Sequence, residues 1–312
     1  MLDLFPSQPP SISISPFSVR YQMIMHYGFV AQANTYRPYW ILVDSSGATP
    51  KQTKHILQAG QQLAFQYSAE RYCTGRYDLL ADGLSLSPCP HQAKLPPTRP
   101  APQCFACDKA RGFHPAFDTL PAAALSPQQQ QYNRFPHDVY LAYFAPGVIK
   151  VGISCQPRLK KRWLEQGARA ACLLQAMPDA YQARALEKKV VALGLLERVY
   201  TKQKKQWLLH CPFDQTKANL QLAQKRANIC QALQLKTPNS AVLDFESIYW
   251  PTPPPPLAAM ATMTSIYGQR WFFHTMIGDI VVLYNGNIYT LVALKAVLGQ
   301  LKVAIQESAC ST

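Results

Sequence analysis

The sequence predicts an α+β protein with a central sheet-and-helix domain, a cysteine-rich region before it and a small β-domain after it. Three observations support this class. Two short apolar runs flank a Pro-Gly turn and are followed by stretches with helical periodicity. Four cysteines gather in a proline-rich segment upstream. Runs of β-branched and aromatic residues follow a proline-rich stretch near the end.

The first part of the chain combines a tail with an N-terminal region. Residues 1–18 are rich in proline and serine, which is typical of a flexible tail. Residues 19–127 form the N-terminal region. There the apolar run 39–43 predicts a strand, and the spacing of apolar residues in 52–67 predicts a helix. The polar tract 128–131 is interpreted as a linker.

Cysteines gather within residues 70–120, a segment with clustered prolines and little apolar periodicity. Such a segment cannot build much of a core alone and needs a cross-link or a metal. The cluster consists of Cys73, Cys89, Cys104 and Cys107. The last two have the spacing of a zinc knuckle. We therefore expect a structural Zn²⁺ held by four thiolates in a zinc-ribbon-like segment, with His91 as a substitute ligand. Buried structural thiols, or a redox pair of cysteines, are the alternatives.

The central domain is expected over residues 134–236, including the helix that ends it. The runs 138–144 and 148–154 are rich in β-branched or aromatic residues and flank a Pro-Gly turn, so they predict a β-hairpin. A basic helix over 157–166 and an apolar, strand-like run over 168–176 follow. The expected fold is therefore a three-stranded antiparallel sheet with helices.

A second helix is expected to begin at Asp179, which together with Gln182 resembles a capping box. Apolar residues then recur at three- and four-residue spacing and mark the buried face, and Glu187 lies beside that stripe. A basic turn is predicted at 201–205, and a long amphipathic helix at 214–236.

The end of the chain has the composition of a linker followed by strands. Five prolines fall within residues 251–256, which indicates a semi-rigid linker. The strands are predicted at 270–273, 279–284 and 288–292. The Asn285-Gly286 pair indicates a tight hairpin turn between the last two strands, because both positions tolerate positive φ. We interpret residues 257–312 as a small β-domain.

Positive charge is concentrated in the central domain. The chain has a formal net charge of +14, and residues 134–236 hold 18 of its 31 Lys and Arg but only 6 of its 17 Asp and Glu. Such a local excess is typical of a polyanion site, with a generally basic soluble surface as the alternative.

No apolar run of about 18 residues predicts a transmembrane helix, and no secretory signal is recognised. We expect a cytoplasmic protein with reduced or metal-bound thiols and no membrane partner.

Two triplets stand out in the predicted hairpin. They are Val139-Tyr140-Leu141 and Lys150-Val151-Gly152. With an arginine on the next helix and the lone Glu187 on the helix after it, they follow the order of the GIY-YIG nuclease superfamily, which residues 137–210 resemble. Val139 stands where the signature has its first glycine, and Lys150 stands where it has its second tyrosine.

The whole chain also resembles an uncharacterised bacterial family in which a GIY-YIG-like domain follows a Cys-rich segment. This second resemblance rests on the runs 73–79, 88–90, 103–107 and 164–170.

The resemblance implies a phosphodiester site. Glu187 would hold one Mg²⁺ or Mn²⁺, and Arg162, or alternatively Arg158, would bind the phosphate. Tyr140 would orient or activate water. Lys150 would contact the phosphate, position Tyr140 or act as a base. Structural roles are the alternative for each residue: a core tyrosine, a solvated helix face, and an ion pair of Glu187 with Lys150 or Arg162.

We expect a nucleic-acid-binding protein, with DNA preferred over RNA and metal-dependent endonuclease action as a possible activity. The cations expected to contact nucleic acid are Arg158, Lys160, Lys161, Lys202, Lys204 and Lys205. Two alternatives stay open. One is a non-catalytic nucleic-acid-binding module with a degenerate site, which Lys150 favours. The other is a protein–protein adaptor whose basic face meets an acidic partner. The oligomeric state is left open.

Overall fold

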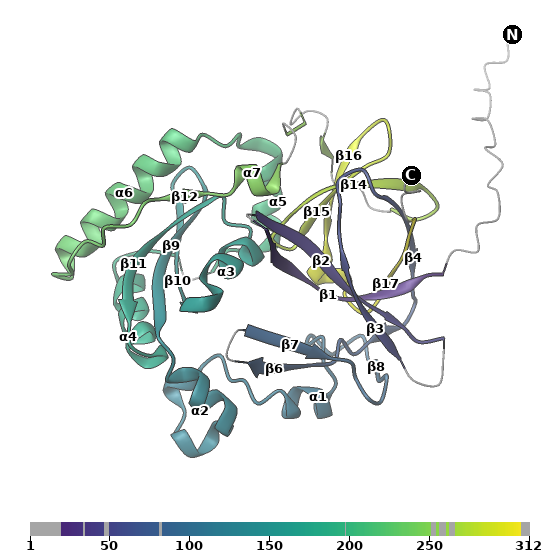
Figure 1. The fold of residues 1–312 in the computed structure, drawn as a ribbon, viewed down its shortest axis with the longest axis horizontal. Coiled ribbons are helices and arrows are strands. Elements are labelled where there is room, and N and C mark those ends of the chain that lie inside the picture. The colour runs from purple at the N-terminus through teal and green to yellow at the C-terminus, as the bar shows by residue number, and fades with distance from the viewer. Residues whose placement is uncertain are drawn as a thin grey trace, which may run out of the picture.

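The computed structural model describes residues 20–33, 35–46, 50–80, 83–196, 198–250, 254–255, 260–261 and 266–306. The expected tail at 1–18 lies outside the described residues, as does most of the expected linker at 251–256. The fold mixes helices with two main sheets, and the cysteine-rich segment lies below both in the view of Figure 1. None of the helices in the described residues combines the length and apolar character that a bilayer crossing needs.

The large sheet joins strands from both ends of the chain. Its order is β13-β16-β15-β14-β4-β17-β1-β2-β3. The N-terminal strands are β1 (Gln22–Gln32), β2 (Thr35–Asp44), β3 (Lys51–Ile56) and β4 (Gln62–Tyr67). The C-terminal strands are β13 (Met260–Ala261), β14 (Arg270–Ile277), β15 (Ile280–Tyr284), β16 (Tyr289–Ala293) and β17 (Leu301–Ile305). The two sets lie side by side in Figure 1 as purple and yellow strands.

Two expectations for these regions are corrected by the large sheet. The C-terminal strands do not form a sheet of their own, since β17 pairs with β1 and β4, and β14 pairs with β4. The segment 52–67 is not a helix but β3, a turn and β4. Gly60 has φ of 82° in that turn and donates its N–H to the Phe273 carbonyl at 2.8 Å. Pairing with distant strands therefore overrides the weak helical pattern of this segment.

The central sheet has the order β10-β9-β11-β12. Its strands are β9 (His137–Ala145), β10 (Val148–Cys155), β11 (Ala170–Met177) and β12 (Leu243–Asp244). The predicted β9–β10 hairpin is confirmed by its antiparallel register, in which Tyr140 lies opposite Gly152. The expected three strands are joined by a fourth, because the two residues of β12 pair with the start of β11.

The helices follow their sequence signals where these signals are local. The α-helices are α1 (Phe105–Ala110), α2 (Pro127–Asn133), α3 (Leu159–Gln166), α4 (Ala180–Ala192), α5 (Thr201–His210), α6 (Gln215–Ala232), α7 (Glu246–Tyr249) and α8 (Leu294–Val297). Short 3₁₀ turns lie at η1 (Phe117–Thr119), η2 (Ala122–Ala124) and η3 (Gln156–Arg158). Asp179 caps α4 by accepting from the Gln182 N–H at 2.8 Å, as predicted.

Two segments that were expected to be irregular are helical. Residues 128–131 lie in α2, because Pro127 stands in its first turn and the Ser126 hydroxyl accepts from the Gln129 N–H at 3.1 Å. The expected basic turn at 201–205 is the first half of α5.

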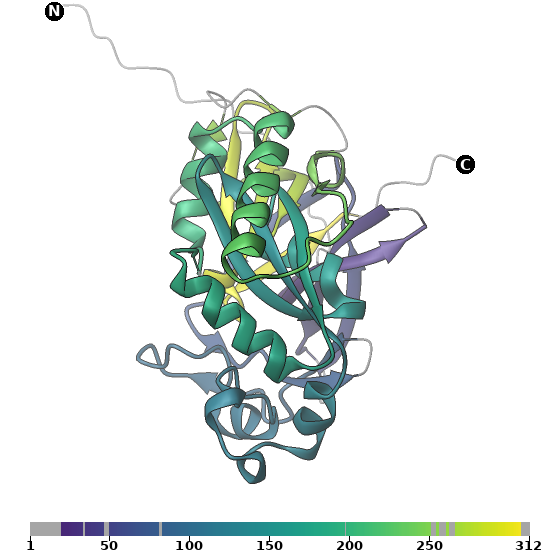
Figure 2. The same cartoon turned by 90° about the vertical axis from the view of Figure 1, so that its left-hand side faces the viewer.

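The two faces of β9 bury different partners. Val139, Leu141 and Tyr143 belong to an apolar cluster with residues of α4 and α6, and Figure 2 shows these helices across that face. The alternate residues, Tyr140, Ala142 and Phe144, belong to a second cluster. This cluster also holds Trp163 and Leu164 of α3 and, from the large sheet, Trp40, Trp271 and Val282. A continuous core therefore runs from the central sheet through α3 to the large sheet.

The end of α3 touches a turn of the large sheet. Gly167 follows α3 with φ of 73°, and Gly278 turns the chain between β14 and β15 with φ of 61°. A β-carbon on Gly278 would lie 2.7 Å from the Gly167 nitrogen, so the two backbones touch. The next residue, Asp279, is 1% exposed and accepts hydrogen bonds from Thr201 and Lys204 of α5.

We predict that Gly278→Ala lowers the free energy of unfolding by about 1–3 kcal/mol, a typical cost of overpacking. The added carbon would lie 2.7 Å from the Gly167 nitrogen and 2.9 Å from the Gln166 carbonyl carbon. Urea unfolding measures the loss. Gly147→Ala is the matched control, because its φ is 76° and nothing lies within 4 Å of an added β-carbon. Equal losses in the two variants would show that the contact does not constrain the fold.

Candidate functional site

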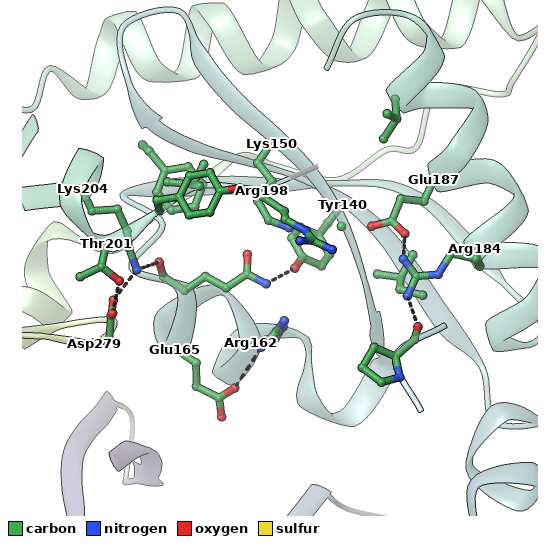
Figure 3. A pocket seen from close by; sticks show the side chains of 18 of the residues that line it. Tyr140, Lys150, Arg162, Glu165, Arg184, Glu187, Arg198, Thr201, Lys204 and Asp279 are labelled. Atoms are coloured by element: carbon green, nitrogen blue, oxygen red, sulfur yellow. Dashed lines mark hydrogen bonds and ion pairs between the residues drawn. The ribbon is translucent and has the colours of Figure 1, made fainter. Parts of the chain in front are cut away.

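A pocket of about 850 Å³ lies where β9, β10, α3, α4 and α5 approach the β14–β15 turn. It is lined by all four residues to which the sequence assigned roles in phosphodiester chemistry. They are Tyr140, Lys150, Arg162 and Glu187. Figure 3 shows these side chains converging from two strands and two helices. We call this space the central pocket.

Tyr140 forms the floor of the central pocket. Its side chain is fully buried and lies across the opposing strand at Gly152, where a β-carbon would come within 2.5 Å of the hydroxyl oxygen. A glycine is therefore needed opposite this tyrosine. Burial raises the pKa of Tyr140, an effect that Arg162 opposes. The hydroxyl is consequently a neutral hydrogen-bonding group rather than a phenolate.

Gln166 links Tyr140 to Arg162, and the sequence analysis did not single it out. Its carboxamide lies 2.7 Å from the Tyr140 hydroxyl oxygen. With the amide oxygen turned toward both neighbours, that oxygen accepts from Tyr140 at 2.7 Å and from Arg162 Nε at 2.8 Å. The spacing of Arg162 and Gln166, one helical turn apart, was the available signal, but only the fold brings Tyr140 to them.

The two candidate arginines, Arg158 at the end of η3 and Arg162 on α3, have different surroundings. The Arg162 side chain is 44% exposed and lines the central pocket, with Gln166 as a hydrogen-bond partner and Glu165 at 3.9 Å. The Arg158 side chain is 12% exposed, lies 3.1 Å from Glu165 and does not line this pocket. Arg162 is therefore the arginine available to a ligand there.

Glu187 lies on α4 beside the buried apolar stripe, as its spacing predicted, and is 4% exposed. It forms an ion pair with Arg184, one turn earlier on the same helix. Arg184 also donates to the Pro115 carbonyl at 3.4 Å and lies against the Phe117 ring. The structural alternative for Glu187 was an ion pair with Lys150 or Arg162, whereas Arg184 was not considered from the sequence.

Lys150 comes from β10, directly beside the tyrosine–glycine pair. Its side chain is half-buried, lines the central pocket and donates to the Val151 carbonyl at 3.2 Å. A short parallel bridge joins its backbone to Leu196. An ammonium group therefore lines the wall of the pocket.

Among the described residues, the lining of the central pocket is cationic overall. Its cations are Lys150, Arg162, Arg184, Lys188, Arg198, Lys204 and Lys295. Its carboxylates are Asp118, Glu165, Glu187 and Asp279. Each carboxylate has an ion-pair partner, since Asp118 binds Lys188 at 2.5 Å and Asp279 binds Lys204. The excess of cations suits an anionic ligand.

The remaining cations that were expected to contact nucleic acid fall into two groups. Lys160 and Lys202 are exposed, and Lys161 is half-buried. Lys204 instead binds Asp279. Lys205 donates to the Leu291 carbonyl at 2.8 Å, and burial lowers the pKa of Lys205. These two lysines attach α5 to the large sheet, so their ammonium groups already have protein partners.

The four clustered cysteines meet as their spacing predicted. The sulfur atoms of Cys73, Cys89, Cys104 and Cys107 all lie within 4.8 Å of one another. They are held near two small antiparallel strand pairs, β5 (Arg71–Tyr72) with β8 (Lys94–Leu95) and the hairpin β6 (Arg76–Leu80) with β7 (Gly83–Ser87), and by α1.

This cysteine cluster has the chemistry of a thiolate metal site. Cys89 and Cys104 place their sulfurs 4.0 Å apart, which is too far for a disulfide. Four sulfurs about 2.3 Å from one zinc lie about 3.8 Å apart, so the observed spacing fits. The Cys73 sulfur accepts from the Cys104 N–H at 3.1 Å. His91 is exposed and is not part of the group. The cluster can therefore hold a metal such as zinc.

Comparison with known proteins shows a similarity over part of the chain. Residues 122–264 match the model of a family described as a protein of unknown function, DUF2797. The match spans the central sheet and α3–α6, including all four residues of the predicted phosphodiester site, and it excludes the cysteine cluster. No curated protein matches the chain, and no solved structure matches it.

We predict a strong energetic coupling between Gly152 and Tyr140. Gly152→Ala should cost about 1–3 kcal/mol of unfolding free energy, because the added carbon meets the tyrosine ring. In a Tyr140→Ala background the same change should cost at least about 1 kcal/mol less, which a double-mutant cycle by urea unfolding measures. An equal cost in both backgrounds would mean that the ring does not require the glycine.

Proposed function

We propose that this protein binds nucleic acid through the cationic surface around the central pocket, and that the pocket is a GIY-YIG-like phosphodiester site. One observation carries the proposal. Four residues chosen from sequence order alone, spread from position 140 to position 187, line a single cationic pocket. DNA is the expected ligand, and phosphodiester hydrolysis is the expected reaction.

The pocket offers the groups that this reaction needs. Arg162 presents a planar, partly exposed guanidinium, which suits two-point contact with a phosphate. Lys150 adds a second cation and occupies the place of a signature tyrosine. The neutral Tyr140 hydroxyl, held by Gln166, can orient an attacking water without losing its own proton. Gln166 also holds Arg162, so it acts as a positioning residue.

Glu187 would hold the divalent cation, Mg²⁺ or Mn²⁺, that neutralises charge on the scissile phosphate. Magnesium is commonly bound by one or two carboxylates together with water and substrate phosphates, so a lone glutamate fits this chemistry. The ion pair with Arg184 competes for the same carboxylate. Cation binding would therefore require Arg184 to move or to share Glu187.

A non-catalytic nucleic-acid-binding module is the second candidate, and two observations favour it. Arg184 already neutralises Glu187, and Lys150 replaces a residue of the signature. Such a module would keep the phosphate contacts of Arg162 and Lys150 without cleaving.

The cysteine cluster is proposed to hold one structural Zn²⁺. We predict that Cys104→Ser with Cys107→Ser removes the metal and makes residues 70–120 protease-sensitive, because few other apolar contacts hold that segment. Elemental analysis and limited proteolysis measure both effects. Cys211→Ser is the control, since Cys211 is a half-exposed cysteine outside the cluster. A double variant that stays protease-resistant without metal would contradict the structural role.

We predict that Glu187→Gln lowers divalent-dependent DNA cleavage by roughly 100-fold or more, a typical cost of losing a group that stabilises transition-state charge. DNA affinity should change little, because most of it comes from cations. Asp118→Asn is the matched control, since it removes another carboxylate of the same pocket and should retain cleavage. Arg162→Ala should weaken both binding and cleavage. Gel-based cleavage of nicked, branched and linear DNA, with anisotropy for binding, provides the readouts.

The same experiment separates the two candidates. DNA binding that weakens strongly between about 50 and 200 mM salt, with no cleavage by any divalent metal, would support the non-catalytic module. An affinity that does not respond to salt would contradict the polyanion site altogether.

A further inference from the structure

A second pocket of about 600 Å³ opens on the other side of α3. Its walls come from β1–β3 of the large sheet, from α3 and from the cysteine-rich segment. It shares lining residues with the central pocket, including Tyr27, Arg162 and Glu165. We call this second space the aromatic groove. The shared residues place the two spaces next to each other.

The charge of the aromatic groove is strongly one-sided. Seven of its lining residues are Lys or Arg, whereas Glu165 is its one carboxylate among the described residues. Glu165 is itself 3.1 Å from Arg158 and 3.9 Å from Arg162. The groove is therefore suited to a ligand with several negative charges.

Aromatic rings stand among these cations. The rings of His26 and Tyr27 are stacked, with centroids 5.8 Å apart and an interplanar angle of 19°. The rings of His26 and Tyr77 are T-shaped, with centroids 5.4 Å apart. All three side chains are only partly buried. Burial lowers the pKa of His26 to about 4, so its ring is neutral near pH 7 and adds apolar surface rather than charge. A purely electrostatic site would not need these rings.

Tyr39 repeats the arrangement of the central pocket. It lies opposite Gly28 in the β1–β2 register, and a β-carbon on Gly28 would come within 2.8 Å of the Tyr39 hydroxyl oxygen. The ring therefore lies against the backbone of β1. The exposed Lys54 places its ammonium 4.3 Å from the centre of the ring. A ring and a cation thus occupy adjacent positions on the wall of the groove.

We propose that the aromatic groove binds an unpaired segment of the nucleic acid whose phosphodiester lies in the central pocket. Aromatic faces and interleaved cations are how proteins hold single strands, because bases stack on the rings and phosphates meet the cations. Bases in a duplex already stack on one another and cannot offer their faces to a protein ring. The proposal rests on the proposed function. It assigns the N-terminal strands and the cysteine-rich segment, which supplies Tyr77 and Arg111, to substrate selection.

The test measures the affinity of the full-length protein for three labelled probes by fluorescence anisotropy. The probes are an oligothymidylate of about 12 nucleotides, a blunt duplex, and the same duplex with an oligothymidylate overhang. The single strand and the overhang should bind more tightly than the blunt duplex. Tyr77→Leu and Tyr39→Leu should each weaken binding of the first and third probes by roughly 5- to 100-fold, the usual cost of losing one stacked base. Blunt-duplex affinity should stay within about twofold.

Two control variants and one charge-removing variant keep the test decisive. Tyr77→Phe retains the ring and loses only the hydroxyl, so it should bind like wild type. Tyr67→Leu removes a tyrosine that is 46% exposed on β4 outside the groove and should have no effect. Lys54→Ala, an exposed change that leaves the core intact, should weaken single-strand binding and flatten its salt dependence.

The outcomes distinguish this proposal from the proposed function. Equal affinity for the single strand and the blunt duplex, or equal losses in Tyr77→Leu and Tyr67→Leu, would overturn the aromatic groove while leaving the central pocket intact. Competition by poly-glutamate as strong as by oligothymidylate would overturn it in favour of an acidic peptide. A wild-type protein that binds none of the three probes would remove both proposals together.

Discussion

The position of α3 between the two sheets determines both pockets. Its apolar side packs into the continuous core through Trp163 and Leu164, and its end is held where the backbone of Gly167 touches that of Gly278. The next residue, Asp279, is buried. An unpaired carboxylate there would destabilise the fold, but Thr201 and Lys204 of α5 bind it. With the helix fixed in this way, Arg162 faces the central pocket while Lys161 lines the aromatic groove.

A tyrosine that lies over a glycine of the neighbouring strand lines each pocket. Tyr140 lies over Gly152 and Tyr39 lies over Gly28, each across an antiparallel strand pair. The absent side chain of the glycine lets a large ring lie against the neighbouring backbone. Each ring is thereby held in one orientation, with a cationic side chain close by. The two sheets therefore hold an aromatic ring beside a pocket by the same means.

The net charge of the central domain overstates its free cationic surface. Arg169 is 7% exposed and is used internally, because it donates to the Cys211 carbonyl at 2.7 Å and pairs with Glu246 at 3.2 Å. Lys204 and Lys205 likewise connect α5 to the large sheet. The cations that remain accessible include Arg162, which faces the central pocket, and Lys160 on the same helix. The sequence therefore locates the excess charge, while the ion pairs of the fold decide how much of it is accessible.

The sequence by itself determined the elements whose causes are local. The turn between β9 and β10, the Asp179 cap and the Cys104–Cys107 spacing each act over a few residues, and each was predicted correctly. The tertiary structure alone decided that 52–67 forms strands, that β17 pairs with β1, and that Gln166 joins Tyr140 to Arg162. The physical reason is the separation along the chain between the residues that interact. Pairing between strands that lie far apart in the chain leaves no local signature, because each strand is specified only by the neighbour that it finds.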